Sequence, residues 1–187
     1  LYHDEYYNAF SKWCREHYDW SFPQEQLCVS PGIIPALYQL TETLCTKDEK
    51  TLVNTPAYGY FAHAAEYAGV GILTSPMLKK AAGIIQKYNL WVVSDEIHCD
   101  LTDPEVGYVP FASVSRECAA NSVTCVAASK AFNLAGLQSA AVVIPNEFLR
   151  NKVVRGLNSD EVAEPNCFAT LAAATAFGSC GDWLGEV

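Results

Sequence analysis

Short, continuously apolar runs alternate with helical patterns along this chain. The clearest runs cover residues 90–93, 122–128 and 140–144, and shorter extended runs cover 27–29, 51–53 and 72–73. Helical spacing of apolar residues covers 5–18, 33–45, 59–67, 78–88, 147–157 and 165–184. A strand that is apolar on both sides needs a cover on both faces, and parallel sheets alternate with helices that supply it. The pattern therefore predicts an α/β fold, a three-layer αβα arrangement around a mostly parallel sheet.

Composition limits the partners of the chain. Its 187 residues are 50% hydrophobic and 18% charged, which is enough to bury a core and excludes intrinsic disorder. With 12 Lys and Arg against 21 Asp and Glu, the net charge is −9, and no basic patch is present to bind phosphates. No apolar run approaches the roughly 20 residues that span a bilayer. We expect neither nucleic acid nor membrane as a partner.

The eight cysteines stand singly within apolar stretches and never as a C-x-x-C pair. Disulfide frameworks belong to small secreted domains, whereas buried free thiols belong to reducing compartments. The first residues carry acids and no basic segment, so they do not resemble a signal peptide. We therefore predict free thiols and a cytoplasmic location.

The residues directly after the predicted strands are the candidates for chemistry. In open parallel sheets ligands bind beyond the carboxyl ends of the strands. Those ends carry Gly32, Ile33 and Ile34 at a predicted helix start, Tyr58, Asp95 with His98, and Ser129 with Lys130.

Each candidate has a chemical and a purely structural interpretation. The free amides of a first helical turn at Gly32 suit a phosphate, although Pro-Gly turns are common. Asp95 after an apolar strand would suit a protonated heterocyclic nitrogen, or it could cap the strand or pair with an arginine. Lys130 lies among apolar residues, where a lowered pKa favours Schiff-base chemistry, although a lysine can also extend its amine into water.

A metal site is the weaker alternative. If the run 95–100 were extended, Glu96, His98 and Asp100 would share one face and could bind a hard metal ion. No second segment has ligand spacing, so the sequence favours no metal.

Four motifs in this order resemble the pyridoxal-phosphate enzymes of the aminotransferase class I/II superfamily, which have fold type I. The motifs are SPGIIPAL from Ser30, TPAYGYF from Thr55, VSDEIHCDL from Val93 and SKAFNLAGLQ from Ser129. Together with Trp13 and the Asp-Trp pair that ends at residue 20, they are most similar to the cystathionine β-lyase-like branch of carbon–sulfur lyases.

The resemblance implies roles for these residues. Lys130 would link to pyridoxal 5'-phosphate and remove the substrate Cα proton, and Asp95 would keep the ring nitrogen protonated. Tyr58 would stack on the ring. The phosphate would bind the amides of Gly32, Ile33 and Ile34 and the Ser129 hydroxyl, and His98 would lie near the cofactor oxygen O3′. The implied reaction converts cystathionine or another S-substituted L-cysteine to a thiol, pyruvate and ammonia.

The resemblance also implies what is missing. Residues 1–22 would be an N-terminal helical segment and 23–187 an incomplete cofactor-binding large domain, without the C-terminal small domain and its substrate-binding arginine. Relatives carry a longer stretch, with an Asn-Pro-x-x-Pro segment, between the equivalents of Gly69 and Leu78. The family builds its sites at a homodimer interface. The alternatives are an aminotransferase of the same superfamily, or a truncated, non-catalytic module that retains the fold. We expect the isolated chain to turn over poorly.

Overall fold

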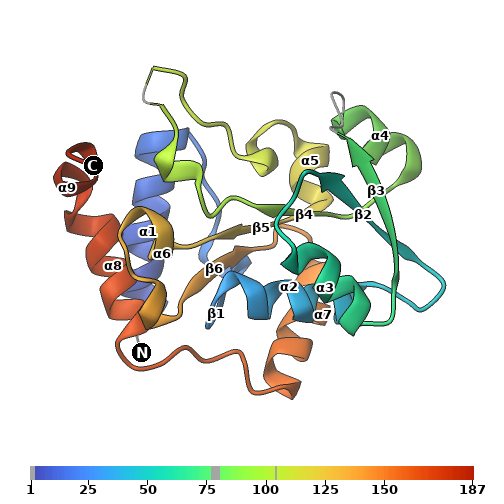
Figure 1. Cartoon of the computed structure of the whole chain (residues 1–187). Coiled ribbons are helices and arrows are strands. Elements are labelled where there is room, and N and C mark those ends of the chain that lie inside the picture. The colour runs from blue at the N-terminus through green and yellow to red at the C-terminus, as the bar shows by residue number, and fades with distance from the viewer. Residues whose placement is uncertain (1–2, 77–80, 104) are drawn as a thin grey trace.

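A computed structural model describes residues 3–76, 81–103 and 105–187 (Figure 1). The first half contains α1 (His3–Tyr18), β1 (Leu27–Ser30), α2 (Ile33–Leu44), β2 (Lys50–Thr55), α3 (Tyr60–Tyr67), β3 (Gly71–Pro76), α4 (Ala81–Tyr88) and β4 (Val92–Asp95). The second half contains α5 (Arg116–Ala120), β5 (Ser122–Val126), α6 (Ala128–Ala131), β6 (Ala140–Val143), α7 (Glu147–Ser159), α8 (Ala169–Ser179) and α9 (Gly181–Gly185). Short 3-10 turns lie at Gln24–Gln26, Cys99–Leu101, Phe111–Ser113 and Ala135–Leu137.

The strands form two sheets. The larger sheet has the order β1-β6-β5-β4, and the smaller one pairs β2 with β3. Strand β6 is antiparallel to β1 and to β5, whereas β4 is parallel to β5, so β1, β4 and β5 run in one direction. The β2–β3 pair is also parallel. The predicted mostly parallel sheet is confirmed, with β6 as the reversed strand.

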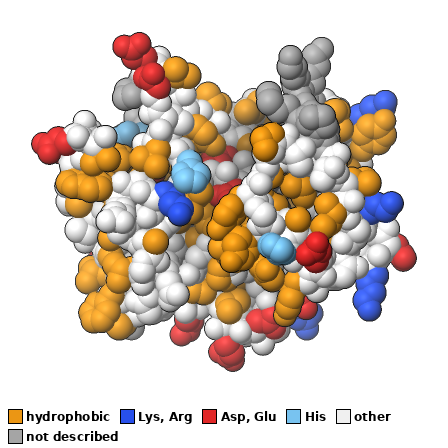
Figure 2. Space-filling model, viewed as in Figure 1, with side chains coloured by type: hydrophobic (Ala, Val, Ile, Leu, Met, Phe, Trp, Pro, Cys, Tyr) orange, Lys and Arg blue, Asp and Glu red, His pale blue; other side chains and the backbone are white. Residues whose placement is uncertain are grey.

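Helices cover both faces of the larger sheet, as the sequence predicts. Alternate residues of one strand enter different cores: Val29 packs with α1 and α8, and its neighbour Cys28 packs with α2 and α7. The same alternation holds for Val143 and Val142 on β6. These two cores give the three layers that Figure 1 shows. Seen from the same side, the surface is hollowed between the part built by α1, α6 and α8 and the part built by α2 and α3 (Figure 2).

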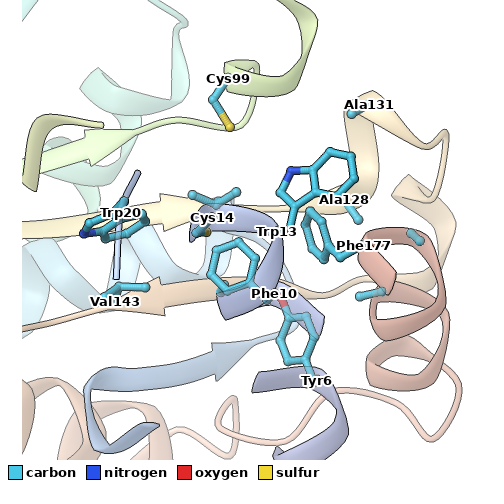
Figure 3. Packing of buried hydrophobic residues seen from close by; sticks show 14 of the residues in the cluster. Tyr6, Phe10, Trp13, Cys14, Trp20, Cys99, Ala128, Ala131, Val143 and Phe177 are labelled. Carbon is cyan, nitrogen blue, oxygen red and sulfur yellow. The ribbon is translucent and has the colours of Figure 1, made fainter. Parts of the chain in front are cut away.

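The core beneath α1 is rich in aromatic rings (Figure 3). Phe10 is fully buried, and its ring centroid lies 5.7 Å from that of Phe22 and 5.1 Å from that of Phe177 on α8. Trp13, one turn further along α1, lies 5.6 Å from the ring of Phe132, which directly follows α6. Helix α1 therefore packs against both α8 and the segment that carries Lys130.

The opposite core requires a glycine where α2 meets α7. A Cβ atom at Gly156 would lie 2.5 Å from Thr43 Oγ1 and 2.9 Å from Gln39 Oε1. Gln39 is also hydrogen-bonded through its amide nitrogen to Asp160 at the end of α7. The close approach of the two helices explains why a residue with poor helix propensity is found inside α7.

Several predicted boundaries differ from the structure by up to four residues. The strand predicted at 90–93 begins at Val92, because Asn89 adopts a left-handed φ of 50° and the Leu90 amide bonds back to the Ile85 carbonyl, which ends α4. The helix predicted at 165–184 begins at Ala169 and is divided into α8 and α9. Residues 78–80 of another predicted helix lie outside the described residues.

The predicted free thiols are confirmed. All eight cysteines are free, and burial raises the pKa of Cys28 to about 11 and that of Cys99 to about 12. Deeply buried thiols of this kind are poor nucleophiles. Within the described part of the chain, no helix has the length and apolar character that crossing a membrane requires.

Candidate functional site

Three predicted segments meet at one edge of the larger sheet. Because β1, β4 and β5 run in the same direction, their carboxyl ends lie at the same edge. Asp95 is the last residue of β4 and pairs with Cys125 on β5. The chain continues from β5 into α6, which carries Ser129 and Lys130. The start of α2, at Gly32, follows the end of β1.

The start of α2 offers an anion-binding turn. Gly32 caps the helix with a φ of 153°, which disfavours any residue with a Cβ atom. The Ser30 hydroxyl donates to the Gly32 carbonyl at 3.0 Å and fixes the turn. The amides of Ile33 and Ile34 have no acceptor among the described residues. Free first-turn amides at the positive end of a helix suit a phosphate.

Asp95 is a half-buried carboxylate at the end of β4. It accepts a hydrogen bond from the Ile97 amide at 3.2 Å, and among the described residues no lysine or arginine forms an ion pair with it. Burial raises the pKa of Asp95, while the Ile97 hydrogen bond and nearby His98 partly oppose that rise. A carboxylate in this position would gain from a protonated nitrogen brought to it by a ligand.

Lys130 is exposed, so its amine stands in water in this structure. Its apolar neighbours do not surround the amine, because Ala131 and Phe132 are buried in the core beneath α1. Of the two interpretations of Lys130, its exposure fits the one in which the amine extends into water. Ser129, its half-buried neighbour, lies on the same short helix. The amine is accessible to a ligand that enters at the sheet edge.

The structure places His98 beside Asp95, whereas Tyr58 comes from the end of a strand in the smaller sheet. Tyr58 follows β2 in the smaller sheet and is 60% exposed, with its ring 5.2 Å from that of Tyr60. His98 is exposed at the turn that follows Asp95 and affects its ionisation. Figure 2 shows acidic side chains at the floor of the hollow and basic and histidine side chains on its rim.

The alternative of an extended metal-binding run is wrong. Residues 96–101 form turns and a 3-10 helix, so Glu96, His98 and Asp100 do not share one face. Glu96 is buried and accepts hydrogen bonds from the Ser94 hydroxyl and from the Phe111 amide, each at 2.9 Å. No group of three potential metal ligands occurs within the described ranges.

Two acids that the sequence did not single out as anchors hold the site in place. Glu96 ties the end of β4 to the loop at Phe111, and burial raises the pKa of its carboxyl group. Asp100 accepts hydrogen bonds from the indole of Trp13, at 2.8 Å, and from the hydroxyl of Tyr18, so it ties the turn after β4 to α1. The sequence feature that could have indicated the role of Asp100 is Trp13 in the first helix, because the N–H of a buried indole needs a hydrogen-bond acceptor.

An apolar groove of about 530 Å³ lies beside α6 but is separate from the candidate residues. Its lining comes from the segment after α6 and from α8 and α9, and comprises Phe132, Leu134, Phe168, Leu171, Ala172, Thr175, Ala176, Cys180 and Trp183. None of the predicted site residues lines it, so it adds nothing to the chemistry of the sheet edge.

Comparison with known proteins agrees with this arrangement. The family model "Aminotransferase class I and II" matches residues 71–183. "Cystathionine beta-lyase PatB" of Bacillus subtilis is 29% identical over 223 residues, which cover 96% of this chain and 58% of PatB. "Protein MalY" of Escherichia coli is 22% identical, covering 97% of this chain and 57% of MalY. The chain thus spans less than two thirds of the length of these curated relatives.

Solved structures agree as well. The PLP-bound C–S lyase from Staphylococcus hominis superimposes with a TM-score of 0.87 at 27% identity, covering 98% of this chain and 58% of that one. Cystalysin from Treponema denticola superimposes with a TM-score of 0.92 at 20% identity, which supports the fold alone. Residues 71–183, which the family model matches, contain Asp95 at the end of β4 and Lys130 on α6.

Proposed function

Since this chain belongs to the aminotransferase class I and II family, we propose that it holds pyridoxal 5'-phosphate at the edge of its larger sheet and supports carbon–sulfur bond cleavage. The observation that carries the proposal is the half-buried Asp95 carboxylate, which lacks a lysine or arginine partner among the described residues and shares a sheet edge with the Lys130 amine. A carboxylate with no lysine or arginine partner in the described ranges and an accessible amine complement a protonated pyridine nitrogen and an aldehyde.

The residues present fit the cofactor group by group. The Ile33 and Ile34 amides, beside Gly32, would bind the phosphate, and the Ser129 hydroxyl would add a donor. Asp95 would bind the ring nitrogen and Lys130 the aldehyde carbon. Two further residues complete the set: Tyr58 would lie over the ring, and His98 would lie near O3′. This assignment accounts for every predicted site residue.

Proton transfer would fall to two of these residues. When bound, pyridoxal phosphate supplies an electron sink for negative charge at the substrate Cα. The Asp95 carboxylate would keep a proton on the ring nitrogen and so maintain that capacity. The Lys130 amine would take the Cα proton, after which the β-thiolate of an S-substituted cysteine can depart. The thiolate would take up a proton to give the thiol, and water would hydrolyse the remaining 2-aminoacrylate to pyruvate and ammonia.

The lyase assignment, with cystathionine or a related S-substituted L-cysteine as substrate, is supported by PatB and by the Staphylococcus hominis lyase. An aminotransferase would use the same acid and amine, so these residues do not separate the two reactions. Incubation with cystathionine tests for pyruvate and free thiol, and incubation with an amino acid and 2-oxoglutarate tests for glutamate. Glutamate without pyruvate would replace the lyase with an aminotransferase.

Reductive labelling tests cofactor binding directly. The chain is mixed with one equivalent of pyridoxal 5'-phosphate, reduced with borohydride and digested for mass analysis. We expect a pyridoxyl adduct on Lys130, which Lys130→Ala abolishes. Lys152→Ala is the matched control, because Lys152 is an exposed lysine that lies over the Phe148 ring and is far along the chain from the sheet edge. Labelling spread over surface lysines in both variants would contradict the site.

Two further predictions from the resemblance accompany the proposal. We propose that 23–187 acts as a cofactor-binding unit to which the segment 1–22 is added, and that the active form is a homodimer. Limited proteolysis tests the first and molar mass in solution tests the second. A stable monomer that binds the cofactor at full affinity would contradict the dimer.

A further inference from the structure

The direction of the Asp95 carboxylate is set by one peptide unit, which joins Glu96 to Ile97. The N–H of this unit donates to Asp95 Oδ1 at 3.2 Å, and its carbonyl accepts a hydrogen bond from the Cys99 amide at 3.0 Å. An aspartate that accepts from the amide two residues later forms an Asx turn, so its side chain follows the backbone of the residue between the two. Here that residue is Glu96. Whatever fixes the Glu96 backbone therefore also directs the carboxylate of Asp95.

Glu96 is held at its backbone and at its side chain. Its amide donates to the Cys125 carbonyl on β5 at 2.8 Å, which extends the contact between β4 and β5 by one residue. Its side chain is buried, and Oε1 accepts hydrogen bonds from the Ser94 hydroxyl and the Phe111 amide, each at 2.9 Å. The Tyr108 hydroxyl also hydrogen-bonds to this carboxylate. The side chain is thus fixed both by its own strand and by the loop that follows.

The hydrogen bonds of Glu96 are more complete than those of Asp100, the other structural acid of this turn. Oδ2 of Asp100 is buried without a partner among the described residues, whereas both Glu96 oxygens escape that condition. A buried polar group with satisfied hydrogen bonds gives the chain around it one definite geometry. Burial raises the pKa of the Glu96 carboxyl group, the Asp95 charge adds to the rise, and the hydrogen bonds oppose it. These bonds therefore offset a cost that a residue merely filling the space would not carry.

We propose that Glu96 is the positioning residue of the sheet edge: it joins β4 to the loop at Phe111 and so holds the Ile97 amide that directs the Asp95 carboxylate. Ser94 and Glu96 share one face of the chain, as their hydrogen bond shows, and Asp95 between them points to the other. Glu96 therefore acts through Asp95. Its effect on the ring nitrogen rests on the proposed function, whereas the direction of Asp95 in the chain without cofactor does not.

Two substitutions separate the position of Glu96 from its charge. Glu96→Gln removes the charge but keeps Oε1, the acceptor of both the Ser94 and the Phe111 hydrogen bonds. Glu96→Ala removes the charge and the acceptor together. The difference between the two variants therefore reports the position of Glu96 alone. Glu105→Ala is the matched control, since it removes an exposed carboxylate from the loop between β4 and α5.

The pKa of Asp95 in the chain without cofactor is the first measurement, followed by the NMR chemical shift of its carboxyl carbon. The Ile97 hydrogen bond favours the ionised form, so the pKa of Asp95 should be about one pH unit higher in Glu96→Ala than in Glu96→Gln. Glu105→Ala should leave it unchanged. The variants retain the other titratable groups that face Asp95, which are His98, Tyr108 and Cys125.

Hydrogen exchange at the Ile97 amide is the second measurement. This amide should exchange about tenfold faster in Glu96→Ala than in Glu96→Gln. Equal pKa values of Asp95 in the two variants, or equal exchange rates at Ile97, would overturn the inference, whatever happens to the melting temperature. If Glu96→Ala does not fold, Ser94→Ala takes its place, because it removes one of the two donors to Oε1. An unchanged exchange rate in Ser94→Ala would then be the overturning result.

A cofactor titration connects the position of Asp95 to the ring nitrogen. Glu96→Ala should bind pyridoxal 5'-phosphate about threefold more weakly than Glu96→Gln, because a misdirected carboxylate gives up part of its hydrogen bond. Equal affinities of the two variants would overturn the link to the ligand. An unmodified chain that binds no cofactor would contradict the proposed function instead, and the Asp95 and Ile97 measurements would still decide the role of Glu96.

Discussion

Asp95→Asn should weaken cofactor binding and stabilise the empty chain. The carboxylate is the proposed partner of the ring nitrogen, and a hydrogen bond to a charged group contributes about 1.5–3 kcal/mol. Because Asp95 is only half-buried, we use the lower end, which corresponds to a dissociation constant for pyridoxal 5'-phosphate about tenfold higher. The amide of the variant keeps an oxygen for the Ile97 amide, so the turn is preserved. Absorbance titration of the cofactor measures the change.

The opposite effect on the empty chain follows from the raised pKa of Asp95. Above that pKa the carboxylate is ionised in the folded and unfolded states, and its burial costs the folded state free energy that asparagine does not. The variant should therefore melt at a higher temperature at pH 7. The advantage should shrink as the pH falls through the raised pKa and vanish below about 3.9, the ordinary value, where the acid is neutral in both states. Calorimetry from pH 3 to 8 measures it.

Asp103→Asn is the matched control for both effects. Asp103 accepts the same kind of hydrogen bond, from the amide two residues later at 2.9 Å, but its side chain is exposed. It should change neither cofactor affinity nor the melting temperature beyond a small amount. Unchanged cofactor affinity in Asp95→Asn would refute the pairing with the ring nitrogen. A lower melting temperature of that variant at pH 7 would refute the burial argument.

Three substitutions test the packing by urea denaturation. Phe10→Ala should lower the free energy of unfolding by about 3–5 kcal/mol, because it empties the centre of the aromatic core, whereas the exposed Phe148→Ala should change it by at most about 1 kcal/mol. Gly156→Ala should lower it by about 1–3 kcal/mol through the clash with α2, whereas Gly83→Ala in α4, where a Cβ atom would meet no atom of the described residues within 4 Å, should raise it by about 0.5–1 kcal/mol. Trp13→Phe should lower it by about 1–3 kcal/mol, since it removes the indole donor of a carboxylate whose second oxygen is already without a partner. An unchanged urea midpoint for Phe10→Ala, Gly156→Ala or Trp13→Phe would contradict the packing argument for that residue.

Most of the larger sheet could be predicted because a strand that is buried on both faces is apolar at every position, which the sequence alone shows. Continuous apolar runs identified β5 and β6, and the strand ends then located Asp95, Lys130 and Gly32 at one edge. The boundary at β4 was missed because the C-terminal turn of α4 at Asn89 depends on a left-handed residue, which hydrophobic spacing does not reveal.

Long-range hydrogen bonds set the limit for the site. Nothing near Glu96 in the sequence indicates that its partner is the Phe111 amide, fifteen residues away, or that Asp100 accepts from Trp13, 87 residues away. The order of the strands is equally non-local, so the separation of β4 from β2 could not be predicted from the periodicity of either strand. Local pattern locates strand ends, but tertiary contacts decide which acids are structural.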